Sequence, residues 1–393
     1  MPVLRALPLA TGLALRDSLG DLVAMAAGAH CFLPVGDDPR AADRRLLESS
    51  LGVGSVVEDP QACLVIATSG STGRPKGAIH TPATLAASAD ATHARLGGEG
   101  NWLLALPAHH IAGLQVLLRA LRAGFTPVIT DLRGGFNADR FAADIALLRG
   151  PRRYTSLVPP QLIAILASPA ATAAAAGLDA VLIGGAATPR SVHDRARAAG
   201  IPIVRTYGMS ETAGGCVYDG QPLDGVSVSI DDEGRVVLCG PMVAHGYHRR
   251  TDPAFGAPGS FRTDDLGTID GGVLQIEGRA DEAISTGGLT VAPHVVEAVL
   301  TADPAVAECV VVGLPDRRLG EQVAAAVVAS PGRTPDVAGL RSRVADQVHR
   351  FAAPRRIVVV DRLPLLGPGK INRAAVRALL RSEAGETEPA AVD

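Results

Sequence analysis

The chain has 393 residues, which is too long for one small hydrophobic core, so its length predicts two or more domains. Hydrophobic residues make up 47% and charged residues 20%, the balance of a globular protein rather than a disordered one. The formal net charge is −3 and no basic block is present, which argues against a nucleic-acid partner. No apolar run approaches the roughly 18 to 20 residues that a membrane span needs.

The cysteines and the N-terminus indicate a cytoplasmic protein. The cysteines are odd in number, lie far apart and form no C-x-x-C pair, which favours reduced thiols and argues against a structural zinc. The N-terminus lacks the charged region, continuous apolar region and cleavage site of a signal peptide. The five cysteines are Cys31, Cys63, Cys216, Cys239 and Cys309.

A loop rich in glycine and hydroxyl groups follows the first strong strand pattern. The apolar run 62–67 predicts a short buried strand that leads directly into this loop. Glycines bring backbone N–H groups close to an anion, hydroxyls add neutral donors, and a lysine adds a mobile positive charge. The spacing is not that of a P-loop, and a plain surface loop is the alternative interpretation. The candidate phosphate-binding residues are Thr68, Ser69, Gly70, Ser71, Thr72, Gly73 and Lys76.

The use of lysine favours the phosphate-binding interpretation. Lysine and arginine together number 37, and only two of them, Lys76 and Lys370, are lysines. Arginine occupies every other basic position, so the two retained lysines indicate tasks that a planar guanidinium cannot perform.

Helical spacing and buried strands alternate through the following 130 residues. A strand at 102–107 ends at the adjacent histidines His109 and His110. Neighbouring residues rarely face one metal ion, and no acidic or cysteine partner is near in the sequence, so a pocket-lining role is favoured over a metal site. The alanine tract 170–176 predicts either a helix or a loose connector. Helices are predicted at 81–96, 114–123 and 136–148.

Two further strand ends carry small or chemically active residues. The strand that begins at 180 ends in the segment 184–186, which either lets a flat ligand approach the backbone or forms a plain turn. The strand 203–206 leads to Tyr207 and then to Glu211, a lone carboxylate among small and hydroxylated residues. Such a carboxylate suits Mg²⁺ held between protein and substrate phosphates, and a helix-capping glutamate is the alternative.

The pattern changes near 278–288, where we expect a domain boundary. Before it, alternation over 226–238 predicts a β-hairpin, and the paired aspartates of 263–265 form either a solvated turn or a grip on ribose hydroxyls. Beyond it, strands and helices build a small α+β unit that ends in a glycine-proline loop carrying Lys370. Residues 383–393 are acidic and rich in Pro and Ala, which predicts a disordered tail.

Several of these segments, in this order, resemble the motifs of the adenylate-forming superfamily, which contains acyl-CoA synthetases, non-ribosomal adenylation domains and luciferases. The resemblance covers about residues 60–375. The matching segments are 68–77 (phosphate-binding loop), 207–212 (Y-G-x-[ST]-E-T), 263–265 (T-G-D, with Asp264 in the glycine position), 278–281 (hinge) and 367–373 (lysine loop).

The resemblance implies an α/β fold in two parts. Residues 1–280 would form a large N-terminal domain of layered sheets and helices that binds ATP and the acid. Residues 281–382 would form a small, mobile C-terminal α+β lid, with Asp281 in the hinge position. Only 67 residues precede the phosphate-binding loop, fewer than is typical of the superfamily, so the N-terminal region is expected to be shortened.

The resemblance also implies roles for single residues. Lys370 would bridge the substrate carboxylate and the α-phosphate, Thr212 would contact the α-phosphate, and Glu211 would bind Mg²⁺. The adenine and ribose would be held by Gly184, Gly185, Ala186, Tyr207, Asp265 and Arg279. The residues that would contact the acid and the CoA pantetheine are His110, Gly208, Gly214, Gly287 and Gly288.

Within the superfamily, segments 107–113 and 208–218 look like those of the compact o-succinylbenzoate–CoA ligases of actinobacteria, which act in menaquinone biosynthesis. This resemblance implies o-succinylbenzoate, ATP, Mg²⁺ and CoA as partners, with a homodimer as an assembly to expect. One alternative is an AMP-forming CoA ligase for another aryl or acyl acid. The other alternative is a non-catalytic ATP-binding sensor.

Overall fold

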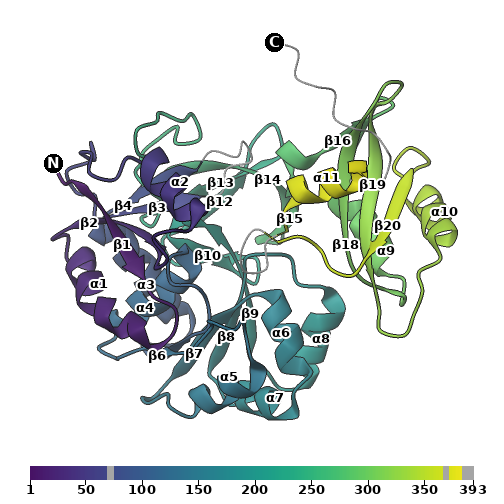
Figure 1. The fold of residues 1–393 in the computed structure, drawn as a ribbon. Helices are drawn as coiled ribbons and strands as arrows, with labels where there is room; N and C mark the ends of the chain where they lie inside the picture. The colour runs from purple at the N-terminus through teal and green to yellow at the C-terminus, as the bar shows by residue number, and fades with distance from the viewer. Residues whose placement is uncertain (69–74, 366–370, 383–393) are drawn as a thin grey trace. The chain divides into compact units, whose positions relative to one another are not determined.

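The computed structural model describes residues 1–68, 75–365 and 371–382 (Figure 1). Its contacts divide the chain into two compact units. The first unit comprises Met1–Asp231, Val236–Thr263 and Ile269–Leu274, and the second comprises Asp232–Arg235, Asp264–Thr268 and Gln275–Asp393.

The first sheet of the first unit has the order β1-β2-β3-β4. Its first three strands run parallel, and β4 returns antiparallel to β3, which makes a hairpin of these two strands. Buried side chains on one face of this sheet form one hydrophobic core. The elements are β1 (Leu4–Leu9), η1 (Leu13–Ser18), α1 (Leu19–Ala26), β2 (Cys31–Gly36), α2 (Ala42–Ser50), β3 (Leu64–Thr68) and β4 (Lys76–His80).

The second sheet has the order β11-β10-β9-β8-β7-β5-β6. Strands β5 to β9 pair in parallel, whereas β10 is antiparallel to β9. The carboxyl ends of the parallel strands therefore meet at one edge, where ligands bind in open α/β sheets. The strands are β5 (Asn101–Leu104), β6 (Val128–Ile129), β7 (Arg153–Leu157), β8 (Ala180–Ile183), β9 (Ile203–Met209), β10 (Gly214–Tyr218) and β11 (Gln221–Pro222).

Both faces of this sheet are covered, because successive strand residues point to opposite sides. Trp102 and Leu104 belong to one core, which also takes side chains from α3 (Pro82–Arg95) and α4 (Ile111–Arg122). Leu103 belongs to the other core, against the helices that Figure 1 shows beside β7 to β9. These helices are α5 (Ala138–Ile145), α6 (Pro159–Leu166), α7 (Pro169–Ala176) and α8 (Arg190–Ala198).

The helix ends follow from local chemistry. Thr81 and Thr84 form a reciprocal capping box, in which each hydroxyl accepts from the other residue's backbone N–H (3.2 and 3.0 Å), and Pro82 occupies the first turn of α3. The alanine tract is a helix, α7, whose start is fixed by the Ser168 hydroxyl, which accepts from the N–H of Ala171 at 3.3 Å.

A third sheet has the order β12-β13-β14-β15, and its first two strands are the predicted hairpin. The turn interpretation of 263–265 is wrong, because these residues lie inside β14. Phe261, Thr263 and Asp265 are buried at alternate positions while Asp264 is exposed, so the period of a half-buried strand overrides the turn preference of paired aspartates. The strands are β12 (Ser227–Ile230), β13 (Arg235–Cys239), β14 (Ser260–Asp270) and β15 (Val273–Arg279).

The C-terminal part of the second unit is the predicted α+β arrangement, with the sheet order β17-β16-β19-β18 and β20 parallel to β19. One face packs on α9 (Pro293–Thr301) and α10 (Val337–Gln347), and the other packs on α11 (Arg373–Ser382). The strands are β16 (Ile284–Thr286), β17 (Leu289–Val291), β18 (Val306–Asp316), β19 (Gly320–Ala329) and β20 (Arg356–Val360). The expected tail 383–393 lies outside the described residues.

The cysteines form no disulfides, and the described helices differ from a membrane span. All five cysteines are free, and burial raises the pKa of the Cys31 and Cys216 thiols to about 12. In the part of the chain that the structure describes, no helix combines the length and the apolar character needed to cross a bilayer.

The start of α4 depends on a glycine. A Cβ at Gly113 would stand 2.3 Å from the carbonyl oxygen of Pro107, so Gly113→Ala must push the helix away from the loop before it. We expect the free energy of unfolding to fall by about 1–3 kcal/mol. In α1, a Cβ at Gly20 meets nothing within 4 Å. Because alanine loses less conformational freedom in a helix than glycine, Gly20→Ala should raise the free energy of unfolding by roughly 0.5–1 kcal/mol. Urea unfolding measures both, and equal effects of the two variants would contradict this account.

Candidate active site

The hairpin of β3 and β4 carries both ends of the predicted phosphate-binding loop. Thr68 is the last residue of β3, and Lys76, the first residue of β4, is its cross-strand partner. The other loop candidates, Ser69 to Gly73, lie outside the described residues. The hairpin thus fixes where the loop leaves the sheet and where its lysine stands.

Lys76 is held by an acidic and an aromatic side chain. Its ammonium lies 3.2 Å from Asp252 Oδ2 and 4.8 Å from the centre of the Tyr247 ring. Asp252 Oδ2 also lies 3.2 Å from the guanidinium of Arg250. A cation over an aromatic face is attracted by the negative face of the ring, so the ring and the carboxylate together hold the ammonium in place.

Tyr247 connects this cation to the predicted magnesium ligand. Its hydroxyl donates a 2.6 Å hydrogen bond to Glu211 Oε1, and Glu211 is only 6% exposed. Burial and the neighbouring Glu211 carboxylate raise the pKa of Tyr247 far above its usual range, which keeps the hydroxyl a donor. Backbone pairing places the ring, because Tyr247 bridges to Ala78 in β4. The ammonium and the carboxylate are therefore arranged around one aromatic side chain.

Glu211 lies in η2 (Ser210–Thr212), a single 3₁₀ turn that joins β9 to β10. The backbone carbonyl of Glu211 accepts from the N–H of Ala244 at 2.8 Å. The hydroxyl of Thr212 donates to the carbonyl of Gly214 at 2.7 Å, and Thr212 is fully buried. In this structure Thr212 stabilises the turn, and its contact with an α-phosphate stays a prediction.

A buried histidine ties this turn to β4. His80 Nε2 donates to the carbonyl of Ser210 at 2.7 Å, and Nδ1 lies 3.1 Å from the Thr84 hydroxyl. Burial lowers the pKa of His80 to about 4, so the imidazole is neutral at pH 7. The turn that carries Glu211 is thereby fixed to the strand that carries Lys76.

Small residues allow close backbone packing beside the turn. A Cβ at Gly208 would lie 2.1 Å from the carbonyl oxygen of Gly214, and one at Gly184 would lie 2.4 Å from the Thr206 hydroxyl. Gly208 therefore requires glycine in this arrangement, whereas a side chain at Gly184 would first have to displace the hydroxyl of Thr206. Beyond β8, Gly185 and Ala186 are exposed, whereas Tyr207 is half-buried. Contact of Tyr207 and of segment 184–186 with adenine stays a prediction.

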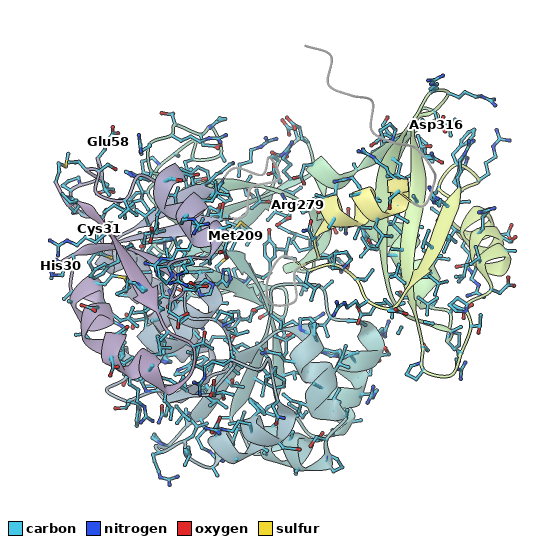
Figure 2. The ribbon with its side chains drawn as sticks, viewed as in Figure 1. His30, Cys31, Glu58, Met209, Arg279 and Asp316 are labelled. Carbon is cyan, nitrogen blue, oxygen red and sulfur yellow. The ribbon has the colours of Figure 1, made fainter. Side chains whose placement is uncertain are left out.

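The second unit holds the predicted ribose-binding residues, which lie close together. Arg279, labelled in Figure 2, donates to Asp265 Oδ1 at 3.3 Å and to the Asp281 carboxylate at 2.9 and 3.0 Å. Burial by itself would lower the pKa of Arg279, but the hydrogen bonds to Asp281 and the charge of Asp265 raise it above its usual range. The geometry joins Arg279, Asp265 and Asp281 into one charged cluster.

Gly287 and Gly288 form the two-residue turn between β16 and β17, where Thr286 pairs with Leu289. Their φ angles of +58° and +80° are those of a hairpin turn that favours glycine at both positions. This turn accounts for both glycines by local geometry, and their approach to pantetheine stays a prediction.

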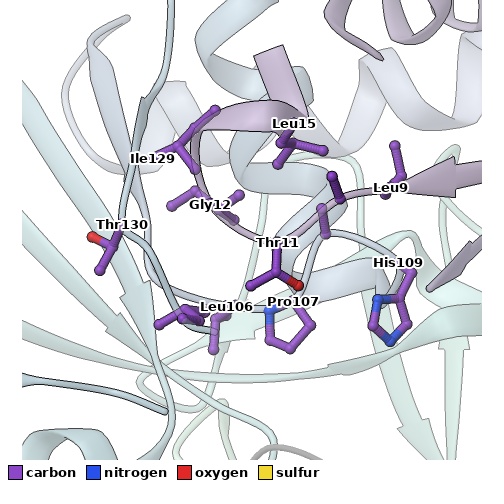
Figure 3. A pocket seen from close by; sticks show the side chains of 13 residues that line it. Leu9, Thr11, Gly12, Leu15, Leu106, Pro107, His109, Ile129 and Thr130 are labelled. Carbon is purple, nitrogen blue, oxygen red and sulfur yellow. The ribbon is translucent and has the colours of Figure 1, made fainter. Parts of the chain in front are cut away.

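The two adjacent histidines lie in different surroundings. His110 is exposed at the start of α4, and its ring lies tilted against that of His109, with the centroids 4.4 Å apart. His109 lines a cavity of about 140 Å³ between the segments that follow β1, β5 and β6 (Figure 3). Burial lowers the pKa of His109. The cavity also contains Thr130, whose buried hydroxyl has no hydrogen-bond partner among the described residues.

The donor set fits a magnesium ion shared with a substrate. Across the described ranges, no group of three or more His, Cys, Asp or Glu side chains can hold a metal by itself. Mg²⁺ instead takes one or two protein carboxylates and completes its shell with water and phosphate oxygens. Glu211 fits this requirement, because Tyr247 holds one of its oxygens in a fixed direction, and its binding of Mg²⁺ stays a prediction.

The sequence patterns do not single out Tyr247, Asp252 or His80. The segment 246–252 has no strand or helix period, and Asp252 lies 176 residues after Lys76. Its one local signal is a tyrosine followed by two arginines and an aspartate, in a chain with only four tyrosines. That density of aromatic and charged groups in an irregular segment is the one sequence signal that could have singled out Tyr247 and Asp252.

Comparison with known proteins connects both units to one family. Residues 35–248 match the model of the AMP-binding enzyme family, and residues 295–370 match its C-terminal domain. The o-succinylbenzoate CoA synthetase of Bacillus subtilis, solved with an acyl-adenylate intermediate, superposes with a TM-score of 0.79 at 22% identity, covering 99% of this chain and 89% of that one.

Curated relatives extend the match. A probable 2-succinylbenzoate–CoA ligase of Mycobacterium tuberculosis is 53% identical over 347 residues, which cover 87% of this chain and 90% of the relative. The 2-succinylbenzoate–CoA ligase of Geobacillus kaustophilus is 30% identical over 81% of this chain and 70% of the relative. By its match to the family model, its similarity to these relatives and its fold, the chain belongs to the AMP-binding, adenylate-forming enzymes.

Proposed function

We propose that this chain is an o-succinylbenzoate–CoA ligase. The observation that carries the proposal is its 53% identity, over nearly the whole of both chains, to the Mycobacterium tuberculosis relative of that name. The chain is an AMP-forming acid–thiol ligase that uses ATP, Mg²⁺ and CoA. Its place in menaquinone biosynthesis follows from this acid.

The first step joins the acid to AMP. A carboxylate oxygen of the acid attacks the α-phosphorus of ATP, the bond to the β-phosphate oxygen breaks, and pyrophosphate leaves. Lys76 and the loop from Thr68 to Gly73 hold the β- and γ-phosphates, and Glu211 holds Mg²⁺, which supplies charge neutralisation when bound. Phosphoryl chemistry of this kind depends on positioning and charge neutralisation more than on a base.

Other residues complete the nucleotide site in this proposal. Lys370, which lies outside the described residues, bridges the carboxylate and the α-phosphate, and Thr212 contacts the α-phosphate. Asp265 and Arg279, which already form an ion pair, hold the ribose. The adenine is framed by Gly184, Gly185, Ala186 and Tyr207.

The second step forms the thioester. The CoA sulfur attacks the acyl carbon, the carbon–oxygen bond to AMP breaks, and the thiol proton is released. Residues 281–382 act as a mobile lid that rotates about Asp281 between the two steps. The rotation withdraws Lys370 from the site and brings Gly287 and Gly288 to the pantetheine. The acid and CoA also meet His110, Gly208 and Gly214. Closure of such a lid limits the access of water to the adenylate.

The cell compartment and assembly are part of the proposal. Five free cysteines and substrates such as ATP and CoA support a cytoplasmic enzyme. A homodimer is proposed as the assembly, and light scattering of the purified protein measures it directly.

A ligase for another aryl acid is the second candidate. An indoleacetate–CoA ligase of Aromatoleum aromaticum is 33% identical over 93% of this chain and 76% of the relative, which supports it. A non-catalytic ATP sensor is disfavoured, because a sensor has no need of a second lysine in the C-terminal region.

Pyrophosphate release tests the function. With ATP, Mg²⁺ and CoA, we expect o-succinylbenzoate to give a kcat/KM at least tenfold above indoleacetate, benzoate and a fatty acid. Highest activity with another acid would support the second candidate. No release with any acid would contradict enzymatic function and favour the sensor.

Lys370→Ala separates the two half-reactions. Because Lys370 neutralises charge in the first step, we expect adenylate formation to fall at least 100-fold, while thioester formation from supplied acyl-adenylate is retained. Arg381→Ala removes an exposed cation from α11 and serves as the control, with both rates unchanged. Equal loss of both half-reactions in Lys370→Ala would defeat the assignment.

Tyr247→Phe tests how Glu211 is positioned. Loss of the donor leaves a buried carboxylate with one hydrogen bond fewer, so we expect the Mg²⁺ concentration for half-maximal rate to rise several-fold and stability to fall by about 1.5–3 kcal/mol. Tyr218→Phe is the matched control, because Tyr218 is also buried and its hydroxyl lies 3.0 Å from that of Thr92. The control should lose stability and keep its Mg²⁺ dependence. A shared shift in both variants would refute the positioning role.

A further inference from the structure

The inner face of α4 carries two polar side chains where a core helix normally carries apolar ones. Gln115 and Arg119 lie one turn apart and are 1% and 3% exposed. Their helix neighbours Leu114, Val116 and Leu117 are fully buried in the core between α3, α4 and the second sheet. Residues of these two types are rarely buried unless they are paired.

Neither side chain is satisfied by the described residues. Both amide atoms of Gln115 and the Nε of Arg119 are buried without a hydrogen-bond partner there. Across the same residues Arg119 forms no ion pair. Its guanidinium carbon lies 5.2 Å from the centre of the Trp102 ring, and the Tyr218 side chain also interacts with its charge. Burial lowers the pKa of Arg119, yet an arginine stays charged at neutral pH. Each unmade hydrogen bond costs about 1–3 kcal/mol, and more for a charged group.

A second buried glutamine beside the same sheet shows the usual outcome. Gln161 in α6 donates to the carbonyl of Ala105 at 2.6 Å and accepts from the N–H of Val158 at 3.0 Å. The buried amide of Gln161 thus has hydrogen-bond partners for both its NH₂ group and its oxygen, as expected of a buried glutamine that stabilises the fold. Gln115 and Arg119 lack such partners, so their polar atoms indicate a ligand.

The position of the pair connects it to the predicted acid site. His110 begins α4, and Arg119 follows nine residues later, roughly 13 Å along the helix axis. A Cβ at Gly214 would stand 3.6 Å from Gln115 Cγ, so Gln115 adjoins the glycine expected to line the acid site. Arg119 follows Gln115 by one helical turn on the same buried face of α4, and its guanidinium lies over the ring of Trp102 in β5.

We propose that Gln115 and Arg119 recognise a second anionic group of the acid substrate, a carboxylate that is not activated. This inference rests on the proposed function, because o-succinylbenzoate has two carboxylates, of which one becomes the acyl group and the other stays anionic. A guanidinium and a carboxylate form charge-assisted, often bidentate hydrogen bonds. The substrate carboxylate then supplies the counter-charge that the protein does not provide, and Gln115 donates to the same group.

Specificity follows from the same charge. A site built to bind a polar group rejects an analogue that lacks it, because its own buried groups are then left unpaired. A monocarboxylic acid of the same shape leaves Arg119 buried without a counter-charge. The pair therefore discriminates dicarboxylic from monocarboxylic aryl acids.

The experiment compares two acids with the full-length enzyme. One is o-succinylbenzoate, and the other is 4-oxo-4-phenylbutanoate, which lacks the ring carboxylate. Pyrophosphate release gives kcat/KM for each acid. We expect the wild type to prefer o-succinylbenzoate at least 100-fold, and Arg119→Met to lose at least 100-fold with this acid but less than fivefold with the monocarboxylic acid. Arg119→Lys should regain part of the loss, and the KM for ATP should not change.

Arg122→Met is the matched control. Arg122 lies on the same helix three residues on, but it is exposed and pairs with Asp90 at the surface. Its removal should leave kcat/KM for both acids within twofold. If Arg119→Met does not fold, Gln115→Leu gives the same comparison with a smaller selective loss.

The outcomes separate the two proposals. An equal loss with both acids in Arg119→Met would mean a structural role and overturn the inference, and so would a wild type that uses both acids equally well. If the wild type releases pyrophosphate with indoleacetate but with neither of the two acids, the proposed function fails first. A selective loss with o-succinylbenzoate supports both proposals.

Discussion

The candidate site depends on the placement of two opposite charges around the ring of Tyr247. The ammonium of Lys76 lies over its face, and its hydroxyl binds the carboxylate of Glu211 at 2.6 Å. The two charges come from β4 and from the turn after β9, which belong to different sheets. His80 joins the same two elements through the carbonyl of Ser210. Backbone pairing, a buried histidine and one tyrosine thus hold a cation and an anion in place before any nucleotide binds.

Much of this arrangement could be predicted from the sequence, because the relevant residues stand at the ends of apolar runs. The run before Thr68 is short and apolar, and the strand before Tyr207 is short and rich in β-branched residues. A glycine follows each within three residues, so the strand ends and their chemistry are local signals. Tyr247 and Asp252 could not be found in this way. Their partners lie 36 and 176 residues away, and the segment that carries them has no period.

The misread aspartates show how local preference can mislead. Paired aspartates are typical of turns, yet β14 continues through them because Phe261, Thr263 and Asp265 face the core. The buried position of Asp265 is also what makes it useful, since Arg279 can hold it there by an ion pair. A strand position gives a carboxylate a more fixed direction than a solvated turn does, which suits the grip on ribose hydroxyls that the superfamily resemblance implies.

Each unit holds its principal cation with an acidic partner of its own: Lys76 with Asp252 in the first, Arg279 with Asp265 and Asp281 in the second. The side chains of these cations keep 22% and 38% of their surface exposed. Partly exposed ion pairs contribute only about 0–1 kcal/mol, because water screens them. Charge-assisted bonds to phosphate are stronger. A nucleotide can therefore displace such a partner at small energetic cost, while in its absence the partner keeps a long flexible side chain ordered. Weak pairing within each unit is thus compatible with tight binding of an anion.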